Sequence, residues 1–147
     1  MTEPMTEQTS WIPGEVPPAD EMTADWWDAT REHRLTVQAC TACGHLQHPP
    51  RALCTGCGDT DHLVQQAVSG AGTVDTYTVV HRAPRKDVET PYVVARVRLA
   101  EGPILLTRLP AEPTIGDAVT VGWVPLPDGR ALPVFHPVTT DSTEETA

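Results

Sequence analysis

Two short stretches of sequence decide the fold of this chain: Cys40-Thr41-Ala42-Cys43-Gly44 and Cys54-Thr55-Gly56-Cys57-Gly58. They contain every cysteine of the chain, and ten residues separate Cys43 from Cys54. Two residues between paired cysteines allow one tight turn to direct both sulfur atoms at one ion. The glycine after each pair permits a backbone conformation in which N–H groups face the thiolates. The spacing therefore predicts a metal site with Cys40, Cys43, Cys54 and Cys57 as its ligands.

A pair of disulfides is the alternative use of four cysteines, and it requires an oxidising compartment. The N-terminus, Met1-Thr2-Glu3-Pro4-Met5, lacks the basic start and apolar run of a secretory signal. We therefore expect a cytoplasmic protein whose cysteines bind a metal. A catalytic zinc keeps one position open for water, whereas four thiolates close the site, so we expect structural Zn²⁺. An iron centre remains an alternative, because thiolate ligands alone do not select zinc.

The acidic residues are concentrated at the two ends of the 147-residue chain, which has a formal net charge of -10. Residues 1–33 contain eight acidic side chains and one basic one, and the segment from Pro137 onwards adds three acidic side chains. Between them, nine acidic residues face nine basic ones, so the net charge does not exclude an anionic ligand. We expect residues 1–21 to be a disordered acidic arm and residues 138–147 a disordered acidic tail. No apolar run approaches the roughly 18 residues of a membrane helix, so we expect no membrane partner.

A helix is predicted over residues 22–34, because Met22, Trp26, Ala29 and His33 recur at helical spacing. Either Asp20 or Thr23 can cap its N-terminus. Two adjacent tryptophans, Trp26 and Trp27, are costly to leave in water. They pack either on this protein's own body or on another subunit.

The second half of the chain is predicted to form five short strands, rich in Val, Thr and Tyr and separated by glycine or proline. Their approximate ranges are 72–81, 92–99, 103–109, 117–124 and 131–135. In the second, Arg96 and Arg98 are expected on one face and Val93, Ala95 and Val97 on the other. Five strands of this length fit a small closed or partly closed barrel of the OB type.

Further short motifs occur along the chain, between and after the cysteines and just before them. They are Leu35-x-x-Gln38, Pro49-Pro50-Arg51, Ser69-Gly70-x-Gly72, Tyr77-Thr78-Val79-Val80-His81, Pro91-Tyr92-Val93-Val94-Ala95, Glu101-Gly102-Pro103, Ile115-Gly116-Asp117 and Leu132-Pro133-Val134-Phe135-His136-Pro137. Over about residues 24–137 this series resembles the acyl-CoA-associated family in which a rubredoxin-like zinc ribbon is joined to an OB fold. The resemblance implies a mainly β protein: an N-terminal helix (22–34), a zinc ribbon (35–66) and a five-stranded OB-fold barrel (67–137).

The resemblance also implies a function. Members of that family are accessory subunits of thiolase-fold enzymes, such as lipid-transfer-protein-like aldolases of steroid side-chain degradation. The chain is accordingly expected to be a non-catalytic acyl-CoA-binding and assembly subunit of an aldolase or thiolase acting on steroid or other bulky thioesters. A polyketide-type acyltransferase or a hydroxymethylglutaryl-CoA synthase assembly is the alternative partner. The family places the acyl-CoA path near the junction of ribbon and barrel, and the partner contact on the barrel and helix.

Five residues are candidates for contact with coenzyme A. The resemblance implies that Pro50 and Arg51, with Pro49, form the inner turn of the ribbon that faces the barrel. Arg82, Arg85 and Lys86 lie in the densest basic segment of the chain, residues 81–86. Guanidinium groups match the phosphates of CoA in a two-pronged way. The alternative for this segment is a solvated loop between two strands.

Two other functional classes are less well supported by the sequence. Ribbons and OB folds often bind single-stranded nucleic acid, but the neutral body, with one Phe and two Tyr, lacks the expected basic and aromatic groove. An independent enzyme would need a catalytic motif, and the sequence contains no Gly-x-Ser-x-Gly, phosphate-binding glycine loop or His-Glu-x-x-His. Asp75 and Asp117, which could be considered as catalytic acids, do not belong to any such motif. We therefore expect no nucleic-acid partner and no catalytic residue.

Overall fold

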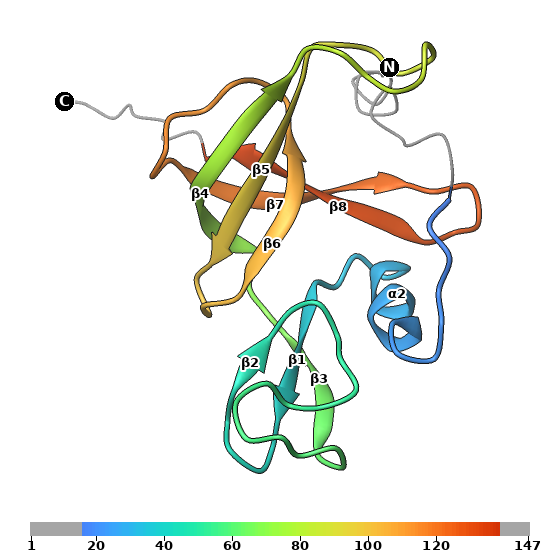
Figure 1. Cartoon of the computed structure of the whole chain (residues 1–147), viewed down its shortest axis with the longest axis vertical. Helices are drawn as coiled ribbons and strands as arrows, with labels where there is room; N and C mark the ends of the chain where they lie inside the picture. The colour runs from blue at the N-terminus through green and yellow to red at the C-terminus, as the bar shows by residue number, and fades with distance from the viewer. Residues whose placement is uncertain (1–15, 139–147) are drawn as a thin grey trace, which may run out of the picture.

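The computed structural model describes residues 16–138, so most of the predicted arm and tail lie outside the described residues. Figure 1 shows a β-barrel above a smaller ribbon, with one short helix beside both. The elements are α2 (Ala24–Thr30), β1 (Thr36–Cys40), β2 (Leu46–Gln47), β3 (Leu63–Ala67), β4 (Ala71–Val80), β5 (Tyr92–Leu99), β6 (Ile104–Leu109), β7 (Ala118–Pro125) and β8 (Ala131–Pro137). Within residues 16–138, no helix is both long and apolar enough to span a bilayer.

The predicted mainly β architecture is confirmed. The ribbon is an antiparallel sheet with the order β2-β1-β3, and the barrel is a sheet with the order β6-β5-β4-β7-β8. Each predicted barrel strand is present, with its ends within two residues of the predicted ones. No ladder joins the outer strands β6 and β8, but the Thr107 hydroxyl donates to the Pro133 carbonyl across that gap. The barrel is therefore closed by side chains at this seam.

The helix is shorter than its predicted range because turns flank it on both sides. Asp20 caps the turn that leads into the helix, because its carboxylate accepts hydrogen bonds from the N–H groups of Met22 and Thr23. Thr23, at the N-cap position of α2, forms no side-chain capping bond. At the other end the Arg34 N–H donates to the Ala29 carbonyl and the His33 N–H to the Thr30 carbonyl. This pair of bonds is a Schellman motif, which needs a residue in the left-handed region.

His33 occupies that left-handed position, with φ 56°, where glycine is the usual residue. Its ring stacks on Trp123 of β7, with centroids 5.4 Å apart and planes inclined by 9°. The stacking contact between helix end and barrel offsets part of the backbone strain at this residue. The end of the helix is thus fixed against the barrel.

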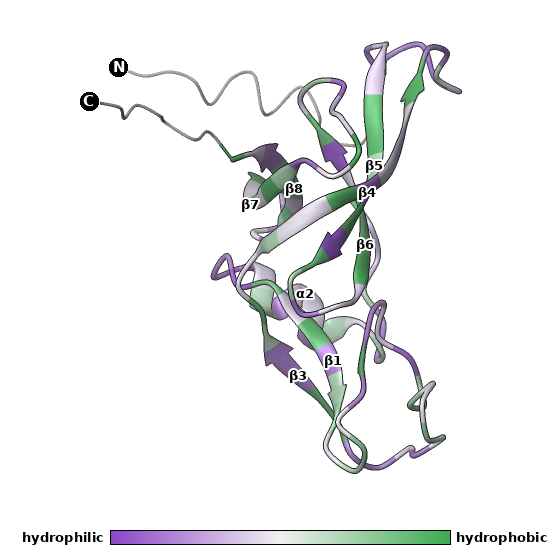
Figure 2. Cartoon of the chain, turned by 90° about the vertical axis from the view of Figure 1, so that its left-hand side faces the viewer, coloured by the Kyte–Doolittle hydropathy of each residue, from purple (hydrophilic) through white to green (hydrophobic). Residues whose placement is uncertain are grey.

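Alternation along the barrel strands matches the prediction from the sequence. Val93, Ala95 and Val97 of β5 are buried, whereas Arg96 and Arg98 are exposed on the outer face. Figure 2 shows the same alternation of hydrophobic and hydrophilic residues along the barrel strands. Because successive side chains of a strand point to opposite faces, the outer face of β5 is polar throughout its C-terminal half.

One continuous hydrophobic core joins the helix, the start of the ribbon and the barrel. Trp26 and Trp27 are both buried, and the Trp26 indole N–H donates to the Thr36 carbonyl. The side chain of Thr30, fully buried, accepts a hydrogen bond from the Ala131 N–H of β8. Packing of the two indoles on the protein's own body is confirmed. A helix-mediated contact with another subunit would have to use other side chains.

Candidate metal centre and ligand cleft

The two cysteine knuckles have the same backbone geometry. In the first, the Cys40 N–H donates to the His45 carbonyl and the Gly44 N–H to the Cys40 carbonyl. In the second, Cys54 and Gly58 repeat these two bonds, with the Asp59 carbonyl as the first acceptor. The glycines after the knuckles, Gly44 and Gly58, adopt φ values of 84° and 81°, as the sequence predicted. Each knuckle is therefore a rigid turn that presents two sulfur atoms.

The four sulfur atoms fit a tetrahedral metal ion. All four Sγ atoms lie within 4.8 Å of one another, and the Cys40–Cys57 and Cys43–Cys54 pairs are 3.8 and 3.6 Å apart. A tetrahedron with zinc–sulfur bonds of about 2.3 Å has sulfur–sulfur edges of roughly 3.8 Å. A disulfide would need about 2.05 Å, and all four cysteines are free. The predicted metal site is thus confirmed in its geometry, and Zn²⁺ bound there would be a structural, fully coordinated ion.

Backbone N–H groups support the sulfur ligands of this site. The N–H groups of Gly56 and Cys57 point at the Cys54 Sγ, at 3.3 and 3.4 Å. Donors directed at a thiolate stabilise its charged form, which is the form that binds metal. Cys40 and Cys54 are buried, whereas Cys43 and Cys57 are exposed at the tip of the ribbon.

Two buried glutamines connect the second knuckle to the inner turn of the ribbon. Gln47 accepts hydrogen bonds from the Thr55 N–H and hydroxyl, and its amide donates to the Leu53 carbonyl and to the Gln38 Oε1 atom. Gln38 in turn accepts from the Arg51 N–H at 2.8 Å and donates to the Arg51 carbonyl at 3.1 Å. Gln38 belongs to the motif Leu35-x-x-Gln38, but the sequence predicted no role for either glutamine. Their placement opposite each other in the β1–β2 pairing is the signal that could have revealed them.

A cleft of about 550 Å³ lies at the junction of ribbon and barrel. His48 and Pro49 of the ribbon form one wall, and Arg96, Ile104 and Leu106 on the outer face of the barrel form the other. Leu106 is 70% exposed, so its side chain is open to a molecule in the cleft. Burial lowers the pKa of His48 to about 4, so this ring is neutral near pH 7. The cleft therefore combines apolar side chains and a guanidinium group on the barrel wall with a neutral imidazole on the ribbon wall.

Profiles of known protein families match both parts of the chain. "ChsH2, rubredoxin-like zinc ribbon domain" matches residues 27–62, and "ChsH2, C-terminal OB-fold domain" matches residues 65–124. A solved structure titled "Ltp2-ChsH2(DUF35) aldolase" superimposes with a TM-score of 0.74 at 38% identity, over 83% of this chain and 98% of the matched chain. The chain belongs to the ChsH2 family.

Two curated relatives of this ChsH2-family chain are longer proteins. A "Probable enoyl-CoA hydratase alpha subunit" of Thermomonospora curvata is 39% identical over 90% of this chain and 43% of its own length. The "3-oxo-4,17-pregnadiene-20-carboxyl-CoA hydratase alpha subunit" of Mycobacterium tuberculosis is 36% identical over 76% of this chain and 37% of its own length. This chain therefore spans less than half of either relative. A DUF35 protein of unknown function from Sulfolobus solfataricus shares the fold, with a TM-score of 0.59 at 18% identity.

The five predicted CoA contacts of this ChsH2-family chain do not lie together. Pro50 is buried, and Arg51 lines a separate hollow of about 320 Å³ that also contains Glu21 and Asp25. The segment 81–91, which contains the other three, follows the far end of β4 from the ribbon (Figure 1). In that segment Arg85 forms a two-pronged contact with the Asp87 carboxylate, at 2.6 and 3.0 Å. None of the five lines the ribbon–barrel cleft.

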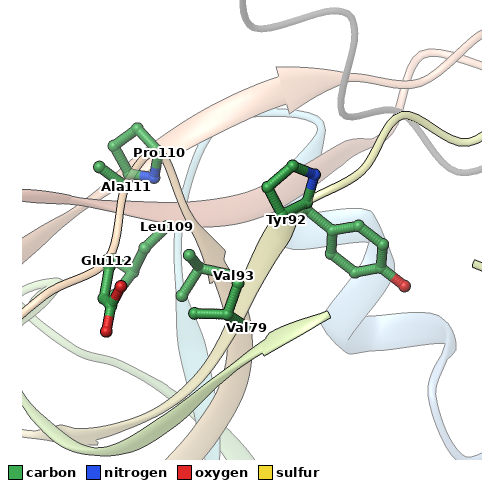
Figure 3. A pocket seen from close by; sticks show the side chains of 8 residues that line it. Val79, Tyr92, Val93, Leu109, Pro110, Ala111 and Glu112 are labelled. Atoms are coloured by element: carbon green, nitrogen blue, oxygen red, sulfur yellow. The ribbon is translucent and has the colours of Figure 1, made fainter. Parts of the chain in front are cut away.

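A second cavity, of about 240 Å³, lies beside the segment that contains the basic residues. Figure 3 shows Val79, Val93 and Leu109 along it, with Glu112 on one side and Tyr92 on the other. The Tyr77 hydroxyl donates to the Glu112 carboxylate at 2.8 Å. A small apolar cavity with one carboxylate is a poor match for a phosphate group.

The acid Asp75, which the sequence left without a partner, has two in the structure. It lies at a register shift in β4, between Val74 and Thr76. Its carboxylate oxygens lie 3.4 Å from the Arg96 guanidinium and 3.6 Å from that of Arg98. A bulge redirects a side chain and is not visible as a sequence pattern, which is why this cluster was missed.

Proposed function

We propose that this chain is a non-catalytic subunit that binds acyl-CoA thioesters and assembles with a thiolase-fold enzyme. The favoured partner is an Ltp2-like aldolase or thiolase acting on steroid or other bulky acyl-CoA thioesters. The observation that carries the proposal is the correspondence with 98% of one chain of the Ltp2-ChsH2(DUF35) aldolase, at 38% identity. The names of the curated relatives, both hydratase alpha subunits for CoA thioesters, support the same substrate class.

The site supports a binding role more readily than a catalytic one. Among residues 16–138, the potential metal ligands that cluster are the four cysteines, and these fill all positions of a tetrahedral ion. Such an ion would hold the ribbon together, and carbon–carbon chemistry would take place on the partner's residues. The ribbon–barrel cleft, with apolar side chains and a guanidinium group on the barrel wall, suits a thioester with a long chain.

The proposal is tested by co-expression of this chain with an Ltp2-like thiolase-fold protein. We expect one complex by size-exclusion chromatography with light scattering, and cleavage of a steroid acyl-CoA substrate by the complex but not by this chain alone. Turnover by this chain alone would overturn the accessory role. Failure to form a complex with the aldolase, together with a complex with an acyltransferase or a hydroxymethylglutaryl-CoA synthase, would select the alternative assembly.

A further inference from the structure

The outer face of the barrel beside the cleft has a row of cationic side chains next to a row of apolar ones. In the β5–β6 ladder Arg96 lies opposite Leu106, and Arg98 lies opposite Ile104. Directly opposite residues of an antiparallel pair share one face and have Cβ atoms about 5 Å apart. The four side chains therefore form a compact square, cationic along β5 and apolar along β6.

Asp75 holds the two arginines in place from the neighbouring strand. Its two carboxylate oxygens each face a different guanidinium group, and the Arg98 side chain also donates to the Gly102 carbonyl. Both arginine side chains remain about half exposed, at 52% and 53%. One carboxylate neutralises only one of two guanidinium charges, so the pair keeps a net positive charge that is open to solvent. Arg108 adds a further cation on the same face of β6.

The ribbon supplies the opposite wall of this square. His48 and Pro49 lie across the cleft from Arg96 and the apolar row. The Nδ1 atom of His48 is buried and has no hydrogen-bond partner among the described residues. Because this atom is buried, we assign it no contact with a bound molecule. The site thus has a cationic row and an apolar row on the barrel side, and His48 and Pro49 on the ribbon side.

We propose that Arg96, which lines the cleft, and Arg98, which lies next to it on the same face of β5, bind the phosphates of a CoA thioester, and that Ile104 and Leu106 contact the chain of the same molecule. This inference rests on the proposed function and names the residues that would recognise the ligand. CoA combines a diphosphate and a 3′-phosphate with a long, uncharged chain, which matches a cationic row beside an apolar row. Two guanidinium groups held side by side can each bind a phosphate through two N–H donors. The segment with Arg82 and Lys86, at the other end of β4, is the competing phosphate site.

The test is calorimetric titration of CoA into the full chain, loaded with zinc. The double variant Arg96→Gln/Arg98→Gln should bind CoA about tenfold more weakly, since each arginine would contribute a charge-assisted but half-exposed contact. The matched control, Arg82→Gln/Lys86→Gln, removes the same charge at the other end of the barrel and should change affinity less than about twofold. Thermal unfolding checks that both variants fold. Arg96→Lys/Arg98→Lys should restore part of the affinity, because charge is kept and the planar fork is lost.

Two truncated ligands identify the contacted group. The weakening caused by Arg96→Gln/Arg98→Gln should vanish with pantetheine, which has no phosphate. If it persists with 3′-dephospho-CoA, the arginines contact the diphosphate, and if it disappears they contact the 3′-phosphate. Unchanged CoA affinity in this variant, with loss in the Arg82→Gln/Lys86→Gln control, would overturn the inference and leave the accessory role intact. An absence of CoA binding by the wild-type chain would also overturn it, while complex formation with the aldolase tests the proposed function separately.

Discussion

Replacement of Gln47 by methionine tests whether the buried glutamine pair supports the metal site. Methionine has nearly the same length and volume, so the substitution removes hydrogen bonds without opening a large cavity. Four hydrogen bonds of the Gln47 side chain are lost: two from Thr55, one to Leu53 and one to Gln38. The second knuckle loses the contacts that fix Thr55, the residue immediately after the ligand Cys54.

The expected loss of folding free energy in Gln47→Met depends on whether the groups that lose their hydrogen bond to Gln47 are exposed to water. A protein hydrogen bond contributes about 1 kcal/mol net, so four of them set an upper limit of about 4 kcal/mol. Leu53 and Thr55 are exposed and can bond to water in the variant, and Gln38 keeps its bond from the Arg51 N–H. We therefore expect a loss of about 2 kcal/mol. Because the metal binds only the folded ribbon, this loss corresponds to roughly 30-fold weaker zinc binding.

Two measurements check this value. Competition with a chromophoric chelator reports zinc affinity, and thermal unfolding of the zinc-loaded protein should show a melting temperature lower by roughly 5–8 °C. Gln66→Met in β3 is the matched control, because the same change is made at an exposed position of the same sheet. It should alter stability by less than about 0.5 kcal/mol. Equal zinc affinity in Gln47→Met and Gln66→Met would refute the proposed supporting role.

Three further predictions concern other parts of the structure. Cys40→Ser, or removal of the metal by a chelator, should unfold the ribbon. Amide hydrogen exchange should then become faster in β1 and β3 than in the barrel strands. Equal protection of β1 and β3 with and without metal would contradict this prediction. Thr30→Val leaves the buried Ala131 N–H without its acceptor and should cost about 1–2 kcal/mol in urea unfolding, whereas Thr120→Val at an exposed position should cost little. Burial lowers the pKa of His48 from 6.5 to about 4, so the unfolded chain binds a proton where the native chain does not. The free energy of unfolding of the wild type should therefore fall as the pH drops from 6.5 towards 4, and it should fall less in His48→Gln. Parallel pH profiles of the two proteins would show that His48 does not contribute.

Features governed by local sequence could be predicted. The cysteine spacing correctly predicted that the four sulfur atoms come together, and the glycines after the knuckles have the positive φ values that the turns require. Strand alternation correctly placed Arg96 and Arg98 on the outer face of β5. The role of Asp20 as an acceptor in the turn before the helix was also predictable, because such bonds join residues two or three positions apart.

Features that depend on contacts between distant segments could not be predicted. His48 and Leu106 both line the cleft, but they are far apart in the sequence, so no local sequence pattern predicts that they lie near each other. Asp75 reaches both arginines only because one extra residue interrupts the β4–β5 register. His33 occupies a position normally held by glycine, and its compensating contact, Trp123, comes from a strand 90 residues later. Arg82, Arg85 and Lys86 were predicted from the density of positive charge along the chain, whereas the cation that lines the cleft is Arg96 of β5.

The metal site and the cleft lie at different ends of the ribbon, and the glutamine pair explains how one can affect the other. The knuckle of Cys54 is held by Gln47, Gln47 bonds to Gln38, and Gln38 holds both backbone groups of Arg51. Arg51 closes the turn that begins at His48, which is a wall of the cleft. A closed zinc site can thus affect the shape of the cleft without lining it, because each step from Cys54 to His48 is a direct hydrogen bond or a link along the backbone. Loss of the metal should consequently weaken CoA binding even though none of the four cysteines lines the cleft, and Gln47→Met should reproduce a part of that effect with zinc still bound.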